Sequence, residues 1–513
     1  MHKLILPAPM LSTGMLSLAL AACTVGPDFV KPTLAAPEHF ARSEPSGAGA
    51  GTLDAPAPAP APDAEFWRAF NDPELTKLID AALLANHDLR IALAHYDHAN
   101  ALLRGARLDR FPVVTANASA SDVRASADQA PGVSRADRDT RDYSAGIAAS
   151  WELDLFGRVR RGVEAQRAEA WAASSDLDAL QVAVVGEVAN SYFELRGLQE
   201  RLRVARRNAG NQAETLQLVQ ARLDAGRGTD FDTARARAQR EATLARIPAL
   251  EAAAAVHMHR LAVLVGQPPE ALIAELEQPA SLPAQPGRLD PGTPGTLLRR
   301  RPDVIAAEHR LHASTARIGV ATADLFPRFT LGGLLGSQAV DSGALFERDS
   351  ETHLVALGID WSFLDIGHVR ARIAASNADA AGELARYQKA VLLALEDTEN
   401  ALVRYSATRT EDEHLDRAAT DSATAARLAR VRYEAGATDL LDVLDAERTQ
   451  LQAQDALADA RARSIVAAVG VYRAMAGGWP NREPLRTAAD GSSGSLSGAI
   501  PSLPAAAPSA RAR

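Results

Sequence analysis

Residues Trp151–Arg160 have the sequence WELDLFGRVR, and a related stretch, WSFLDIGHVR, spans residues Trp361–Arg370. The two tryptophans lie 210 positions apart, since 361 − 151 = 210. In both stretches an alternation of apolar and polar residues ends at a glycine and a charged, helix-favouring run begins. This pattern predicts that the chain passes from a β-strand into an α-helix twice, in the same way.

Other pairs of motifs keep nearly the same spacing. Ala225-Gly226 recurs as Ala435-Gly436 and Asp232 recurs as Asp442, both after 210 positions, and Phe111-Pro112 recurs as Phe326-Pro327 after 215. A nearly constant offset across separate motifs indicates an internal twofold repeat. We predict a first copy over residues 64–275, a linker or equatorial segment over 276–295, and a second copy over 296–478.

Each copy is expected to contain one very long helical hairpin, over 158–266 and 368–477. No proline occurs between Pro131 and Pro248, or between Pro327 and Pro480, and strong helix formers dominate both stretches. A continuous helix from residue 158 to 223 would be about 100 Å long at 1.5 Å per residue. Such helices need neighbours along their whole length, so the sequence predicts a bundle or tube of helices that turn at Ala-Gly.

Before each long helix lies a predicted β-hairpin, about 112–154 and about 327–363. In the first, every second residue is apolar, namely Tyr143, Ala145, Ile147, Ala149, Trp151 and Leu153. Val355, Leu357, Ile359, Trp361 and Phe363 repeat this pattern in the second. Such alternation is typical of a membrane β-strand, with Trp151 and Trp361 in an interfacial aromatic girdle. A half-buried sheet of a soluble protein would show the same alternation.

Four strands cannot cross a membrane alone. An open sheet would leave backbone N–H and C=O groups of its edges unsatisfied in lipid, and membrane barrels have about eight strands or more. The fold class is therefore mainly α with a membrane β-barrel portion that subunits share. The strand count requires two or more copies and does not choose between two and three.

The ends of the chain resemble targeting and linking segments. Residues 1–22 have a basic start and an apolar core that ends in Leu20-Ala21-Ala22, directly before Cys23. Cys23 is the only cysteine, and lipidation would remove a thiol that is a liability in an oxidising compartment. We predict a lipoprotein signal peptide over 1–22 and covalent lipid on Cys23; an ordinary signal peptide with a chance cysteine is the alternative. Thr24 fits sorting to the outer membrane.

Composition separates the flanks from the core and excludes some functions. Residues 23–63 are rich in Pro and Ala and predict an extended tether, and 479–513 predict a disordered tail. A net charge of −9 and 5% aromatic residues argue against nucleic-acid binding. No nucleophile elbow, phosphate loop or zinc spacing occurs, so we expect no enzymatic activity, no metal and no cofactor besides the lipid.

At the motif level the chain resembles the TolC-like outer membrane factors, and within them the lipoprotein branch of NodT-type efflux subunits. The matching stretches are LAACTVGPDFVKP (20–32), LLRRRPDVIAAEHRL (297–311), ADLFPRFTLGGLL (323–335) and VRYEAGATDLLDVLDAER (431–448). The resemblance implies a homotrimer with a twelve-stranded β-barrel, a twelve-helix α-barrel through the periplasm and an equatorial belt. It also implies a periplasmic adaptor and an inner-membrane pump as partners.

The Ala-Gly turns should lie at the end opposite the strands, and the candidate site lies beside them. Asp442 and Asp445 are three positions apart, hence on one helical face, and would form carboxylate rings in an oligomer. Asp232 takes the place of Asp442 in the first copy, whereas Arg235 takes that of Asp445, which suggests ion pairs between neighbouring hairpins. A solvated helical face is the plain alternative.

The resemblance adds roles at this tip. Tyr433, Asp442, Asp445 and Arg448, with Asp232 opposite, match positions of the closed aperture's polar lock and constriction, and Leu441 matches an apolar position of the closed pore. Thr438 stands where some members carry a gating arginine, which leaves open which residue holds each link.

The expected function is a lipid-anchored outer-membrane exit duct for drugs or toxic small molecules, opened at its periplasmic tip by partner proteins. A duct of the same fold for type I protein secretion or metal efflux is an alternative. A periplasmic coiled-coil adaptor is a second one, although an adaptor would lack paired membrane hairpins.

Overall fold

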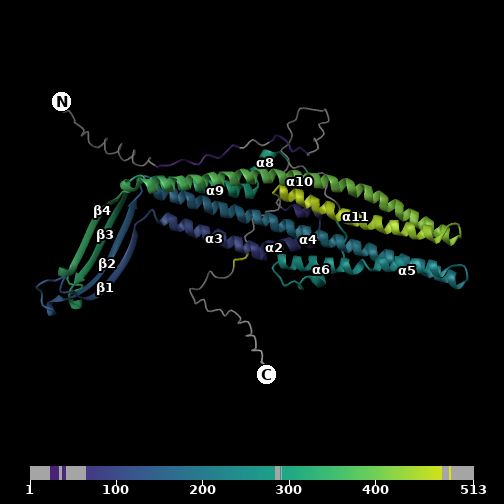
Figure 1. Ribbon diagram of the computed structural model, residues 1–513, viewed down its shortest axis with the longest axis horizontal. Coiled ribbons are helices and arrows are strands. Elements are labelled where there is room, and N and C mark those ends of the chain that lie inside the picture. The colour runs from purple at the N-terminus through teal and green to yellow at the C-terminus, as the bar shows by residue number, and fades with distance from the viewer. Residues whose placement is uncertain are drawn as a thin grey trace, which may run out of the picture.

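The chain forms an elongated rod with a β-sheet at one end and two helical turns at the other (Figure 1). The computed structural model describes residues 24–33, 37–41, 65–283, 289, 292–476 and 484–486. The predicted signal peptide, Cys23, most of the tether and most of the tail lie outside the described residues. Within the tail segment, the Leu485 backbone N–H donates to Leu84 O at 2.9 Å and Arg486 pairs with Asp97 at 2.7 Å.

Two long helices carry the rod, α4 (Arg158–Asp224) and α10 (Ile366–Glu434), of 67 and 69 residues. The other α-helices are α2 (Pro73–Ala85), α3 (His87–Leu108), α5 (Asp230–Leu244), α6 (Ile247–Leu264), α7 (Ile273–Leu276), α8 (Pro294–Leu298), α9 (Pro302–Ala323) and α11 (Leu440–Ala474). Short 3-10 turns are Phe66–Phe70, Ala136–Arg138, Ser342–Ala344, Arg348–Ser350 and Phe363–Asp365. Among the described residues, no helix has the length and apolar character that crossing a membrane would require.

The two helical hairpins turn in the same way. Gly226 and Gly436 have φ of +69° and +74°, the left-handed region that glycine adopts most readily. After each, an N–H bonds back across the helix end, from Arg227 to Arg222 O and from Ala437 to Arg432 O, both at 2.8 Å. These are Schellman caps, which satisfy carbonyls that the helix leaves free. The prediction of long helices broken at Ala-Gly is confirmed.

The returning arms of the two hairpins differ. α11 is continuous, whereas the first copy breaks between α5 and α6 at Ala245-Arg246. Pro248 lies in the first turn of α6, where its missing N–H has no partner to lose. The returning arm of the second copy is therefore one continuous helix, whereas that of the first copy is interrupted at Ala245-Arg246, which we call the joint.

The sheet contains β1 (Val113–Arg124), β2 (Asp139–Leu153), β3 (Arg328–Ala339) and β4 (Glu351–Asp360), all antiparallel in the order β1-β2-β3-β4. The four strands and their alternation agree with the predicted hairpins. β1 continues to Arg124 and β2 begins at Asp139, and the ion pairs Arg124–Asp139 and Arg141–Asp122 join the outer ends of these two strands. β4 ends at Asp360 opposite Arg328, since Pro327 has no N–H with which to continue the ladder.

The strand register collects the apolar residues on one face. Ile147 lies beside Leu335, Leu331 lies between Trp151 and Leu357, and Phe329 lies between Leu153 and Ile359. Most of these side chains are exposed, including Leu335 at 71% and Leu357 at 61%. The opposite face consists mainly of Ser, Thr, Gly and Asn. An exposed apolar band of this kind is a surface for lipid or another apolar partner.

Gly197 of α4 marks a close approach to α11, because a Cβ at this position would overlap Ala462 Cβ. We expect Gly197→Val to destabilise the protein by about 1–3 kcal/mol, since overpacking forces the two backbones apart. The measurement is the midpoint temperature of heat-induced loss of helical circular dichroism.

The matched control is Gly210→Ala on the same helix, where no atom lies within 4 Å of the added Cβ. Alanine there should leave the midpoint unchanged or raise it, because glycine weakens a helix interior by about 0.5–1 kcal/mol. Equal midpoints for Gly197→Val and the parent would contradict the packing argument.

Candidate functional site

The candidate site lies where both helical hairpins turn, at the end of the rod furthest from the sheet (Figure 1). Asp442, Asp445 and Arg448 lie on the first turns of α11, all exposed. Thr438 Oγ1 donates to the Asp442 carboxylate, and Arg448 pairs with Asp445. Leu441 is 52% exposed beside them. The structure therefore brings Thr438, the residue in the place of a gating arginine, into contact with Asp442.

Asp232 takes part in capping the N-terminus of α5. Its carboxylate accepts from the backbone N–H and the hydroxyl of Thr229, at 3.3 and 2.7 Å, which completes a capping box. Arg235 lies over the ring of the exposed Phe231, 5.3 Å from its centroid. Among the described contacts of one chain, none joins Asp232 or Arg235 to Asp442 or Asp445, and the ion pairs between neighbouring hairpins stay a prediction.

Tyr433 joins the ends of α4 and α10. It is 6% exposed, in an apolar cluster with Val219, Leu440 and Val443. The guanidinium of Arg222 lies 4.0 Å from the Tyr433 ring centroid and donates to Tyr433 O at 2.6 Å. A cation over an aromatic face adds about 0.5–2 kcal/mol. This contact ties the two turns of one subunit together.

A buried polar cluster lies one to two helical turns further from the tip. Glu447 of α11 is 5% exposed, and its Oε1 accepts from the Thr215 hydroxyl of α4 at 2.6 Å. Arg430 of α10 donates to Glu447 Oε1 at 3.2 Å and to Thr215 Oγ1 at 2.9 Å. We call Thr215, Arg430 and Glu447 the clasp, because it joins three helices.

Burial dominates the electrostatics of the clasp. The pKa of Glu447 is raised above the ordinary glutamate value mainly by desolvation, which outweighs the hydrogen bond from Thr215 and the charge of Arg430. The second oxygen, Oε2, is buried without a hydrogen-bond partner. Arg430 spreads its charge further by donating to Glu214 Oε2 at 3.0 Å and to Asn211 O at 2.8 Å.

Sequence reasoning missed the clasp, although a signal was present. Leu440, Val443, Leu444 and Leu451 form the buried stripe of α11, and Glu447 occupies a position in that stripe. A charged residue at an apolar position of a helical repeat predicts a buried, paired carboxylate. Its sequence neighbours Asp445 and Arg448 are exposed, so the run of charged residues by itself favours a solvated position for Glu447.

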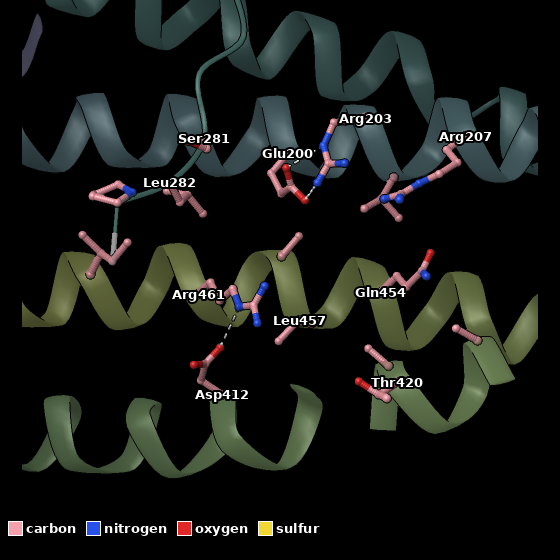
Figure 2. A pocket seen from close by; sticks show the side chains of 16 residues that line it. Glu200, Arg203, Arg207, Ser281, Leu282, Asp412, Thr420, Gln454, Leu457 and Arg461 are labelled. Atoms are coloured by element: carbon pink, nitrogen blue, oxygen red, sulfur yellow. Dashed lines mark hydrogen bonds and ion pairs between the residues drawn. The ribbon is translucent and has the colours of Figure 1, made fainter. Parts of the chain in front are cut away.

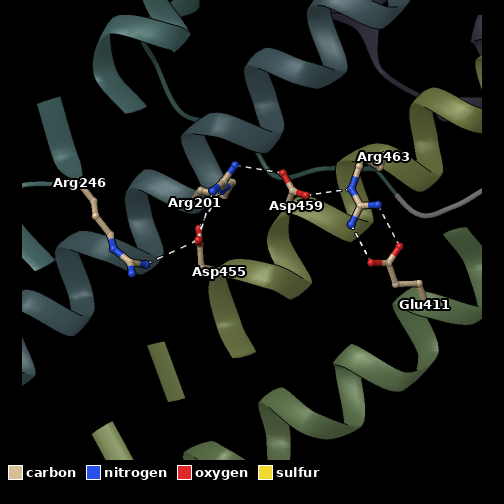
Figure 3. A network of polar contacts seen from close by, with 6 residues as sticks. All are labelled: Arg201, Arg246, Glu411, Asp455, Asp459 and Arg463. Atoms are coloured by element: carbon tan, nitrogen blue, oxygen red, sulfur yellow. Dashed lines mark hydrogen bonds and ion pairs between the residues drawn. The ribbon is translucent and has the colours of Figure 1, made fainter. Parts of the chain in front are cut away.

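Nearer the middle of the rod, a chain of ion pairs crosses four helical segments (Figure 3). Arg201 of α4 bridges Asp455 and Asp459 of α11, at 2.8 and 3.0 Å. Arg463 continues the chain from Asp459 to Glu411 of α10, both at 2.9 Å. At the other end, Arg246 at the joint of α5 and α6 lies 3.9 Å from Asp455. This network fixes the helices above the tip.

Beside this network, a groove of about 680 Å³ runs over α11, between α4 and α10 (Figure 2). Its charges are mostly paired, Arg203 with Glu200 and Arg461 with Asp412, the latter at 3.5 Å. Its lining contains hydroxyls but no histidine or cysteine. The groove therefore offers a surface and no nucleophile–base pair.

The two predicted girdle residues occupy equivalent places at the junction of sheet and helices. Trp151 Nε1 donates to Arg110 O and Trp361 Nε1 donates to Leu325 O, both at 3.0 Å. Each acceptor directly precedes the Phe-Pro motif of its own copy. Phe156 and Phe326 stack between the copies, with ring centroids 4.6 Å apart. An indole with its N–H satisfied and its ring outward suits a membrane interface.

The fold and this site define a class of protein: a rod of long helices that carries two β-hairpins with an exposed apolar face at one end and exposed carboxylates beside the helical turns at the other. Comparison with known proteins identifies the family. The family described as "Outer membrane efflux protein" matches residues 78–267 and 293–477. Since both copies match and together make up most of the chain, the protein belongs to this family.

Individual relatives agree. Nodulation protein T of Rhizobium leguminosarum bv. trifolii is 31% identical over 88% of this chain and 93% of its own. The antibiotic efflux pump outer membrane protein ArpC of Pseudomonas putida is 32% identical over 91% of this chain and 96% of its own. The solved structure of the outer-membrane channel OprN has a TM-score of 0.81 and 42% identity, over 89% of this chain and all of that one.

The protein is thus an outer-membrane channel of the efflux type and not an enzyme, as its sequence predicted. The resemblance to the TolC-like, NodT-type subunits and the internal repeat are confirmed, and the adaptor alternative is wrong. Three His, Cys, Asp or Glu side chains grouped as for a metal ion do not occur in the described part of the chain.

Proposed function

We propose that three copies of this chain form the exit duct of a tripartite efflux pump, with a shared twelve-stranded β-barrel and a twelve-helix α-barrel. The duct would carry drugs or other toxic small molecules passively across the outer membrane. A periplasmic adaptor and an inner-membrane pump would open its tip and supply the energy.

The observation that carries this proposal is the open four-stranded sheet with one apolar face. Among the described residues of one chain, the outer edges of β1 and β4 have no partner strand. In lipid, each unpaired backbone group costs several kcal/mol. Pairing β4 of one copy with β1 of the next removes every edge, and three copies give 3 × 4 = 12 strands. The exposed band around Leu335 and Leu357 then faces lipid, and the Ser- and Thr-rich face lines the lumen.

We place the closed constriction at Asp442, Asp445, Arg448, Tyr433, Asp232 and Leu441. Their position at the free turns supports this assignment, since a threefold axis through the rod would bring these residues of three copies together. Tyr433 and Arg222 hold the turns within a subunit, and exposed Asp442 and Asp445 are free to line the opening. Rings of carboxylate favour cations and concentrate them in a narrow passage.

We also propose the domain limits stated above and an equatorial belt that includes residues 276–295. The start of that segment supports this: Leu276 O accepts from buried Gln199 at 2.7 Å, and Gln278 O accepts from buried Arg196 at 2.8 Å. The segment thus leaves the rod from a fixed point near its middle.

The lipid anchor is proposed from the residues that follow Cys23. Val25 N–H donates to Phe156 O at 3.2 Å, and Thr24 packs against Gly157 at the start of α4. Arg161, 4% exposed, donates to Val25 O, to Gly26 O and, at 2.6 Å, to Asp28. Residues 24–33, the strap, therefore begin at the junction of sheet and helices. A lipid on the residue before Thr24 would enter the bilayer at the level where the barrel leaves it.

Arg161→Ala should release the strap without abolishing lipidation. Removing the buried guanidinium leaves two carbonyls and Asp28 without their donor, so the segment before Pro32 becomes accessible to protease in purified protein. Palmitate labelling should remain in Arg161→Ala and disappear in Cys23→Ser. Labelled Cys23→Ser would contradict the anchor, and protease resistance equal to the parent would contradict the role of Arg161.

The duct is tested with the mature protein in detergent and in planar bilayers. We expect a trimer that resists dissociation in sodium dodecyl sulfate until heated, and discrete channel currents after insertion. Deleting the gene should sensitise cells to toxic small molecules, and the intact gene should restore resistance. A stable, water-soluble monomer that needs no detergent would refute the proposal.

A further inference from the structure

Two leucines lie on the polar face of the sheet, opposite the apolar band. The face opposite the apolar band is formed by alternate residues such as Asn117, Ser119, Ser144, Ser150 and Thr330. Leu334 of β3 and Leu354 of β4 also belong to this face, as direct cross-strand neighbours. The alternation that places Leu335 and Val355 on the lipid side makes Leu334 and Leu354 an exception that needs a reason.

The register places both leucines in a single row of paired residues across the four strands, which we call a level of the sheet. Thr115 pairs with Ala148, Ala148 pairs with Leu334, and Leu334 pairs with Leu354. The neighbouring levels of the same face contain Asn117, Gly146, Gly336 and Thr352 on one side and Val113, Ser150, Gly332 and Ala356 on the other. No other level of this face has a large aliphatic pair.

Packing within the subunit does not account for the pair. Leu354 is 57% exposed and Leu334 is half-buried. The loop between β3 and β4 folds over the face of the apolar band and not over that of the two leucines. On the apolar face Ser337 donates to Leu345 O, and Ala339 is buried. The helices lie beyond the periplasmic end of the sheet (Figure 1). In the proposed barrel, the two leucines would therefore point into the lumen.

We propose that Leu334 and Leu354 of the three subunits form an apolar band around the lumen that binds the apolar part of amphiphilic cargo on its way out. This inference rests on the proposed trimeric duct. A barrel of twelve strands is wider than the eight-stranded barrels that side chains fill, so the band lines the path without closing it.

The chemistry of the band selects a class of cargo. An apolar ring or chain that leaves the water of the lumen for contact with leucine gains about 25 cal/mol per Å² of apolar surface buried. Polar groups of the same molecule remain solvated or contact the Ser, Thr and Asn side chains above and below. Molecules with both parts, such as lipophilic cations, would be retained briefly at this level, whereas small hydrophilic ions would not.

The test uses the trimer in planar bilayers with tetraphenylphosphonium added on the extracellular side, so that the probe reaches the band without crossing the tip. Tetramethylammonium, a small hydrophilic cation, is the control probe. We expect tetraphenylphosphonium to reduce the current, with an apparent dissociation constant about tenfold higher in the double variant Leu334→Ser/Leu354→Ser. Thr115→Leu, at the same level, should lower that constant.

Controls separate this inference from the duct itself. The variants should retain heat-dissociable trimers and the potassium chloride conductance of the parent, which shows an intact channel. An intact channel whose block by tetraphenylphosphonium is the same in parent and double variant would overturn the inference. An equal change for tetramethylammonium would also overturn it, because it would show altered pore geometry. Absence of any channel from the parent would instead refute the duct.

Discussion

Replacing Asp442 and Asp445 together by alanine is expected to raise the single-channel conductance of the isolated trimer several-fold and to weaken its block by trivalent cations about tenfold or more. Both carboxylates are exposed at the turn, and three copies would place six of them around one axis. Such a ring holds a trivalent ion strongly. Its removal also frees Thr438 and Arg448, the two partners that the carboxylates bind within one subunit, so the turn loses part of its fixed shape.

The pairing pattern predicts how the two positions differ. Asp445 holds Arg448, so its loss leaves an uncompensated cation near the axis, which repels a trivalent ion in addition to the lost attraction. Within the described part of the chain, the one side chain that donates to Asp442 is neutral Thr438, so the loss of Asp442 removes charge alone. Asp445→Ala should therefore weaken the block more than Asp442→Ala.

Glu434→Ala is the matched control, because Glu434 is an exposed carboxylate at the end of α10, on the other arm of the same turn. It should leave conductance and block near those of the parent. Unchanged conductance and unchanged block in the double variant would reject the constriction at Asp442 and Asp445 and place the narrowest passage elsewhere.

Much of this architecture could be predicted from local rules that the chain obeys twice. The alternation before Trp151 and Trp361 predicted β-strands with one apolar face, and the register confirms that their apolar residues share a face. The Ala-Gly turns could be predicted because only glycine adopts the left-handed cap readily, and both Gly226 and Gly436 do so. Each of these patterns is weak evidence alone, and its recurrence in both copies makes the predicted strand or turn specific.

Features that depend on tertiary partners could not be predicted in this way. The outer ends of β1 and β2 are joined by Arg124 and Arg141, each of which meets an aspartate across the strands. The clasp depends on three helices whose contacting residues are 17 to 232 positions apart in the sequence. Pattern reasoning assigns a charged residue to solvent unless a partner is known, and Glu447 shows where that default fails.

Arg430→Ala is expected to open the tip and destabilise the closed trimer. Glu447 is buried, and removing the partner of a buried charge costs about 3–5 kcal/mol. Arg430 also carries the bonds to Asn211 O and Glu214, so α10 loses these attachments to α4 and keeps the one from Arg222 to Tyr433 O. Conductance should rise, and cells that carry the variant should become sensitive to vancomycin, which is too large for ordinary porins. Vancomycin resistance and conductance equal to the parent would show that the clasp does not hold the tip.

Glu447→Gln is the matched variant, since its amide oxygen can still accept from Thr215 and Arg430. Because the pKa of Glu447 is raised, the folded protein keeps a proton on this group at pH values where the unfolded chain has lost it. The stabilising contribution of Glu447 is therefore present below the ordinary glutamate pKa and is lost as pH rises through the raised value. Glutamine does not titrate, so the thermal midpoint of Glu447→Gln should rise relative to that of the parent as pH increases from acidic to neutral. A constant difference across this range would mean that Glu447 titrates normally, and the desolvation that makes Arg430 indispensable would be absent.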